Sequence, residues 1–142
     1  MKHISNEEVL AADVDVLVPA ALENQVTAEI AEKLRCKFLV EAANGPTSVE
    51  ADGILGKRNI VLVPDIFANS GGVIVSYFEG TKYSGAHWEI EQVNRMLREV
   101  MRKAFDDIWA TKEECNCDLR KAVYITALRR LVYAQEIKGI FP

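Results

Sequence analysis

Two asparagines, a serine and a glycine pair carry the polar chemistry of this chain. Asn44 ends an apolar run and precedes a glycine, and Asn69 lies just before Gly71 and a second glycine. A side-chain carboxamide donates and accepts hydrogen bonds at once, so it can pair with another amide group. Ser76 adds a hydroxyl that can donate to a carboxylate oxygen. These residue types indicate a ligand-binding site, and we assign none of them a catalytic role.

The elements that position these residues alternate between strand and helix. Apolar, β-branched runs predict strands over 14–18, 37–40 and 60–63. Before and between these strands, helix-capping patterns at Ser5 and Thr47 and a capping threonine at Thr27 predict short helices, the last of which should end at Gly56. Alternating strands and helices of this kind form a parallel sheet with right-handed crossovers. Two long helices are expected after residue 87. The last one begins at Asp118 and has Leu128, Leu131 and Val132 on its inner face, which is either ordinary core or a packing face for another domain.

Parallel strands bring their carboxyl ends to one edge of the sheet, where open α/β folds bind ligands. Pro19, Ala20 and Ala21 end the first strand, and we expect them to lie along a ligand, although simple close packing explains small residues nearly as well. Asn44 and Asn69 follow the next two strands. The alternative for both asparagines is a turn role, in which the side chain only satisfies loop backbone.

Composition excludes several classes of protein. The net charge of −4 comes with scattered Lys and Arg residues, which gives no reason to expect nucleic acid or an anionic membrane as a partner. Three cysteines without matching ligand spacing indicate free thiols, neither a disulfide framework nor a metal site. No run approaches the length of a membrane span, and no leader pattern precedes residue 5. We expect a cytoplasmic protein.

A long run at residues 64–79, PDIFANSGGVIVSYFE, resembles the C-terminal part of glutamate dehydrogenase. The resemblance extends to residues 16–25 and 40–47, in the same order, and covers nearly the whole chain. It implies that Asn69 holds the nicotinamide carboxamide of NAD or NADP, that Asn44 lies on the nicotinamide side, and that Gly71 lets backbone approach the cofactor. It also implies that Ser76 binds the side-chain carboxylate of glutamate. A helical serine that satisfies its own backbone is the alternative for Ser76.

The chain lacks the Gly-x-Gly-x-x-Gly turn that opens a complete dinucleotide-binding fold. We therefore expect one domain, 1–142, with the second half of a Rossmann-like fold at 1–86 and C-terminal helices at 87–142. The first strand would be an unpaired edge, which predicts either self-association or a missing N-terminal segment. The family's catalytic residues and substrate domain have no match here, so we expect the isolated chain to be inactive.

The resemblance implies an NAD(P)-dependent reaction that converts L-glutamate to 2-oxoglutarate and ammonia, in a homo-oligomer that includes the missing substrate domain. Two alternatives remain open. One is a non-catalytic binding or interaction module from a split or truncated gene. The other is part of another amino-acid dehydrogenase.

Overall fold

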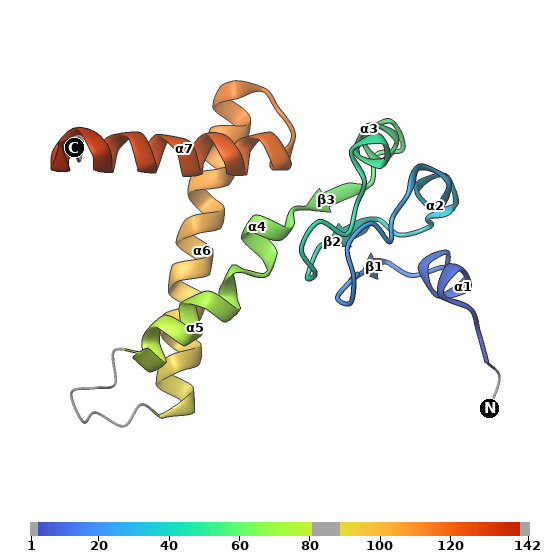
Figure 1. Cartoon of the computed structure of the whole chain (residues 1–142), viewed down its shortest axis with the longest axis horizontal. Helices are drawn as coiled ribbons and strands as arrows, with labels where there is room; N and C mark the ends of the chain where they lie inside the picture. The colour runs from blue at the N-terminus through green and yellow to red at the C-terminus, as the bar shows by residue number, and fades with distance from the viewer. Residues whose placement is uncertain (1–2, 81–88, 140–142) are drawn as a thin grey trace. The chain divides into compact units, whose positions relative to one another are not determined.

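The computed structural model describes residues 3–80 and 89–139 of the 142-residue chain, so the predicted boundary at 86/87 lies outside the described residues. Its elements, labelled in Figure 1, are α1 (Asn6–Leu10), β1 (Val16–Leu17), α2 (Ala28–Lys33), β2 (Phe38–Val40), α3 (Val49–Lys57), β3 (Val61–Val63), α4 (Asp65–Ala68), α5 (Ser70–Gly80), α6 (Ile90–Cys115) and α7 (Leu119–Lys138). They divide into two compact units, residues 1–70 and 71–142, which we describe separately.

The first unit contains a three-stranded parallel sheet in the order β1-β2-β3. Each of the predicted strands is present, and β1 is an edge strand of the described sheet. The α/β class and the parallel topology are therefore confirmed. Helical crossovers account for this order, because each helix returns the chain to the start of the next parallel strand.

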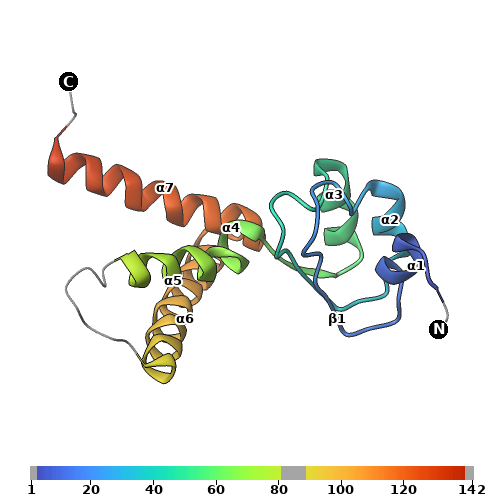
Figure 2. The ribbon, with the colours of Figure 1, turned by 60° about the horizontal axis from the view of Figure 1, so that its bottom comes forward.

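Only one face of this sheet is packed. Leu39 is fully buried in a core that includes Val26, Leu34 and Leu55. The helices α2 and α3 lie next to each other in this unit (Figure 2). The residues of the opposite face, Val16, Phe38 and Val61, are aligned across the three strands and are 49%, 43% and 41% exposed. We call this row the bare sheet face. Parallel sheets are normally covered on both faces, so the described first unit has half of its cover.

Local capping explains where the short helices begin. Ser5 and Glu8 form the predicted capping box, and the Thr27 hydroxyl accepts a hydrogen bond from the Ile30 amide, 3.4 Å away. The cap of α3 differs from the prediction, because Ser48 accepts from the Ala51 amide at 3.3 Å while the buried Thr47 hydroxyl has no hydrogen-bond partner. The shift by one residue follows because the parallel bridge between Val26 and Thr47 continues to Ser48, whose amide donates to the Val26 carbonyl at 3.0 Å, so that Ser48 is also extended and the helix begins after it.

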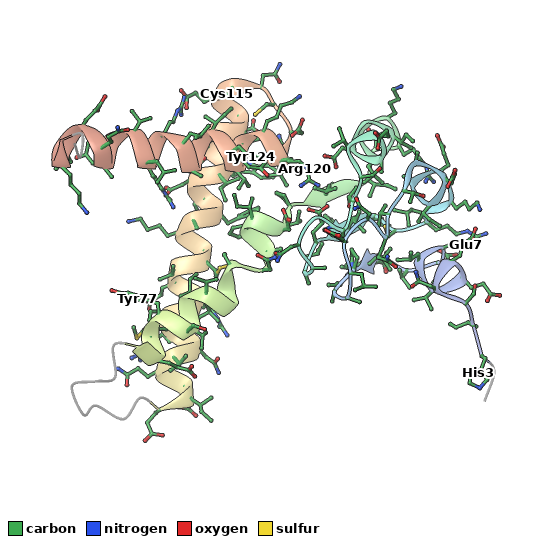
Figure 3. All side chains as sticks on the ribbon, in the orientation of Figure 1. His3, Glu7, Tyr77, Cys115, Arg120 and Tyr124 are labelled. Carbon is green, nitrogen blue, oxygen red and sulfur yellow. The ribbon has the colours of Figure 1, made fainter. Side chains whose placement is uncertain are left out.

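The second unit contains α5 and a pair of long helices. The α6 helix ends where Asn116 takes a left-handed conformation with φ of 46°, and the Cys117 amide then donates to the Lys112 carbonyl at 3.2 Å. Asp118 caps α7 as predicted, accepting from the Lys121 amide at 2.8 Å. Figure 3 shows Cys115 at the end of α6 and Tyr124 on α7. The predicted pair of long C-terminal helices is confirmed.

A buried hydroxyl pair joins α6 to α7. The Thr126 hydroxyl donates to the Thr111 hydroxyl at 2.9 Å and also lies 2.8 Å from the Ala122 carbonyl, while the Thr111 hydroxyl donates to the Asp107 carbonyl at 3.0 Å. Charged pairs flank them at the surface, where Arg129 binds Glu114 through two nitrogen–oxygen contacts. Across the described residues, no helix is both long and apolar enough to cross a membrane.

Candidate functional site

Three strand ends meet at one edge of the sheet in the first unit. The Pro19 carbonyl, at the end of β1, accepts hydrogen bonds from the Ala42 and Ala43 amides at 3.0 and 2.9 Å. The Glu41 amide, at the end of β2, donates to the Val63 carbonyl at 3.0 Å. These bonds continue the sheet past its strands, so the turns after β1, β2 and β3 are held side by side. The candidate site consists of these turns.

A buried carboxylate fixes the third turn to the second. The side chain of Glu41 is fully buried, and its Oε2 accepts a hydrogen bond from the Asp65 amide at 2.9 Å. Asp65 in turn accepts from the Gly45 amide through Oδ2, at 2.8 Å. Two carboxylates thus bridge the turns in sequence. A buried carboxylate must have such donors, because an unpaired one costs several kcal/mol.

Gly45 is required at its position by backbone conformation. Its φ of +53° lies in the left-handed region, while a Cβ placed on it would meet nothing within 4 Å. The glycine is therefore selected for its torsion angle and not for space. This left-handed residue directs the Gly45 N–H at Asp65, and it turns the chain immediately after Asn44.

Asn44 and Asn69 lie together at the end of the two bridged turns. The Asn69 Nδ2 donates to the Asn44 Oδ1 at 2.7 Å. The strand ends therefore bring together the two carboxamides that the sequence singled out, from positions 25 residues apart. The pair leaves the Asn44 Nδ2 as a donor and the Asn69 Oδ1 as an acceptor. Side by side, one donor and one acceptor match the acceptor and donor of a ligand carboxamide.

The other predicted site residues have mixed placements. The side chain of Pro19 is buried and only its carbonyl is used in the site, while Ala20 and Ala21 are exposed beside it. Gly71 and Ser76 belong to the second unit, where both lie on α5. Gly71 is in the first turn of that helix and not in a loop, and Ser76 is exposed. The roles predicted for these residues stay predictions.

Neither Glu41 nor Asp65 was among the residues predicted for the site. The signal for Glu41 was an acidic residue directly after an apolar strand, in a position that continues the buried run. The Asp65 amide that donates to this carboxylate lies 24 residues away and has no sequence signal at all. Among the described residues there is no group of three or more His, Cys, Asp or Glu side chains that could hold a metal ion.

The three turns form a strand-end site of an α/β protein, and comparisons with known proteins place the chain in a family. The family model for glutamate/leucine/phenylalanine/valine dehydrogenases matches residues 1–139. The chain is 49% identical over 142 residues to a glutamate dehydrogenase of Thermotoga maritima and 47% identical over 139 residues to an NAD-specific one of Clostridioides difficile. It covers 34% and 33% of those proteins, respectively.

Solved structures give the same answer. The chain matches glutamate dehydrogenase from Peptoniphilus asaccharolyticus with a TM-score of 0.82 at 42% identity, covering 87% of this chain and 32% of that one. It matches the hetero-hexameric glutamate dehydrogenase of Thermus thermophilus with a TM-score of 0.92 at 28% identity, covering 98% of this chain and 34% of that one. The chain belongs to the glutamate/leucine/phenylalanine/valine dehydrogenase family. It spans about a third of the length of the curated relatives it matches.

Proposed function

We propose that this chain is the cofactor-side, C-terminal part of an NAD(P)-dependent glutamate dehydrogenase, which deaminates L-glutamate oxidatively to 2-oxoglutarate and ammonia. The observation that carries the proposal is the Asn44–Asn69 pair, whose free donor and acceptor fit a nicotinamide carboxamide. The relatives support the cofactor class, since one is named NAD-specific and another, from Synechocystis, NADP-specific. The nicotinamide group would supply hydride transfer when bound.

The residues of this chain would bind and orient the cofactor and the substrate, and they would take no part in the chemical step. Asn44 and Asn69 would fix the rotation of the nicotinamide ring and so decide which ring face meets the substrate. Ala20 and Ala21 are exposed and small, which would let backbone approach the cofactor, and Gly71 would do the same on α5. Ser76, exposed on α5, would donate a hydrogen bond to the glutamate side-chain carboxylate.

Three features of the larger protein belong to the same proposal. The substrate domain and catalytic residues would come from the part of the relatives that this chain does not match, so the chain alone would be inactive. We also propose a cytoplasmic homo-oligomer. The hetero-hexameric glutamate dehydrogenase of Thermus thermophilus supports assembly into an oligomer.

Asparagine substitutions in an enzyme that includes the missing portion test the proposal. Asn69→Ala removes both the bond to Asn44 and the free acceptor, so we expect the KM for NAD or NADP to rise on the order of tenfold. Asn6→Ala is the matched control, because the Asn6 side chain also donates to an exposed amide oxygen, that of Gln25, at 2.8 Å. An unchanged cofactor KM in Asn69→Ala, with the glutamate reaction intact, would contradict the proposed role.

The bare sheet face favours a second candidate, a non-catalytic module that docks on a separately encoded partner. Val16, Phe38 and Val61 would be the covered surface. Mixing the chain with the missing portion separates the two candidates, since recovered glutamate-dependent reduction of NAD or NADP supports the enzyme and association without activity supports the module. Leucine, phenylalanine and valine, tried as substrates in the recovered enzyme, test the other members of the family.

A further inference from the structure

The Asn44–Gly45 peptide is both exposed and chemically labile. Asparagine followed by glycine undergoes spontaneous deamidation, because a residue without a Cβ leaves its backbone nitrogen open to approach the preceding side chain. It is the only Asn-Gly pair in the 142-residue sequence. Asn44 and Gly45 are both exposed, so water reaches the peptide. The sequence and the surface position thus favour the reaction.

The reaction needs only water. The deprotonated Gly45 nitrogen attacks the Asn44 Cγ, a new C–N bond closes a five-membered succinimide, and the carboxamide nitrogen leaves as ammonia after taking a proton from water. Water then opens the ring at either carbonyl. One opening gives aspartate at position 44, and the other gives isoaspartate, in which the chain runs through the side chain.

Two neighbouring residues have opposite effects on the rate of deamidation, since Asn69 favours it and Asp65 opposes it. The Asn69 amide donates to the Asn44 Oδ1 at 2.7 Å, which withdraws electron density from the carbonyl and makes its carbon a better target. Asp65 accepts the Gly45 N–H at 2.8 Å. The carboxylate stabilises the neutral Gly45 N–H by accepting its hydrogen bond. It opposes loss of that proton, because its negative charge repels the amide anion that must form.

We propose that Asn44–Gly45 is a deamidation site and that the Asp65 carboxylate restrains it. Glu41 supports the restraint, since its buried carboxylate holds the Asp65 amide at 2.9 Å and so fixes the start of α4 where Asp65 faces Gly45. The left-handed φ of Gly45 then keeps its N–H on that carboxylate. The turn is thus built so that its reactive nitrogen stays occupied.

Deamidation would change the candidate site, and this consequence rests on the proposed function. The product at position 44 replaces an amide donor by a carboxylate, so the pair with Asn69 loses the donor that faces a ligand carboxamide. The new negative charge also lies one residue from the Gly45–Asp65 contact. The modification itself is independent of any cofactor, and so is its test.

The test follows isoaspartate and aspartate at position 44 by peptide mapping with mass spectrometry, in the full chain incubated at mildly alkaline pH. Wild-type protein should deamidate more slowly than a free peptide of residues 40–50, on the order of tenfold or more. Asp65→Ala should remove most of this difference. Asp65→Asn, whose amide oxygen still accepts the Gly45 N–H without a charge, should fall between the two.

Ser48→Ala is the matched control for general loosening. It removes the cap of α3 in the same unit and leaves the Asp65–Gly45 contact in place, so the rate at Asn44 should stay within about twofold of wild type. Equal acceleration in Ser48→Ala and Asp65→Ala would overturn the role of Asp65. A wild-type rate equal to that of the peptide would overturn the restraint even if Asp65→Ala fails to fold. Absence of products at position 44 in the peptide would overturn the site.

Discussion

Removing the Glu41 carboxylate should destabilise the first unit substantially. Glu41→Ala deletes an acceptor that is fully buried and bonded to the Asp65 amide at 2.9 Å. A hydrogen bond to a charged group contributes about 1.5–3 kcal/mol, and the lost buried methylene adds about 0.8 kcal/mol. Relief of the carboxylate's desolvation offsets part of this loss. We therefore expect a cost of about 2 kcal/mol, against about 1 kcal/mol for Glu41→Gln, which keeps the shape and a neutral acceptor.

The assay must report on the first unit alone. Neither tryptophan of the chain lies in residues 1–70, so native-state hydrogen exchange of the β2 amides, followed by NMR, is the suitable probe. Glu32→Ala on the exposed surface of α2 is the control and should stay within about 0.5 kcal/mol of wild type. An opening free energy for Glu41→Ala that matches this control would refute the reasoning, since a buried acceptor would then have been removed without cost.

Three further predictions concern other parts of the chain. Thr126→Val should lower the free energy of unfolding of α6 and α7 in urea by about 1 kcal/mol. The double variant Thr111→Val/Thr126→Val should cost less than the two single changes summed, because each single change leaves one hydroxyl without its partner and the double change leaves none. Partial burial raises the pKa of Asp118, but hydrogen bonds and charge from Lys121 outweigh it and leave the pKa lowered. The stability that Asp118 contributes is therefore fully present above the unfolded-state pKa of about 4, and it is lost as pH falls through the lower folded-state pKa. Asp118→Asn should reduce the dependence of stability on pH in acid unfolding. Burial raises the pKa of the Cys36 thiol, so the stability that the neutral thiol contributes should be lost as pH rises above about 8.5, the unfolded-state pKa. Cys36→Ala should remove this alkaline loss of stability in thermal unfolding.

The sequence predicted those parts of the fold that local chemistry decides. The strands and the caps at Ser5, Thr27 and Asp118 depend on residues within a few positions of each other, and the structure confirms them. The end of α3 was placed at Gly56, but the helix continues to Lys57. Arg58 follows it and donates to the Ala31 and Leu34 carbonyls of α2, a contact that no local pattern contains.

The helix faces show the same limit. Spacing placed Leu128, Leu131 and Val132 on the inner face of α7, whereas in the structure they are 58%, 66% and 52% exposed. Periodicity identifies an apolar stripe but not what covers it, and the sequence left open a packing face for another domain. The buried face of α7 is instead formed near its start, by residues such as Ala122 and Thr126.

At the candidate site, strand order brought Asn44 and Asn69 to one edge, as parallel topology requires. The carboxylates that hold this edge could not be predicted in the same way. Whether Glu41 points into the unit or out of it depends on the register of β2 against β3, and the donor it meets is a backbone amide, which every residue but proline carries. Side-chain identity and strand order therefore predicted that the two asparagines lie together, while the carboxylates that hold them are visible only in the structure.

The bare sheet face also determines how the first unit responds to temperature. Val16, Phe38 and Val61 already contact water in the folded state, so unfolding hydrates less additional apolar surface than in a fully covered sheet. The heat-capacity change of unfolding should then fall below the usual value of about 12–15 cal/mol/K per residue. A small heat-capacity change flattens the curve of stability against temperature. The unit would consequently melt over a broad interval, and its stability would change little between cold and warm conditions.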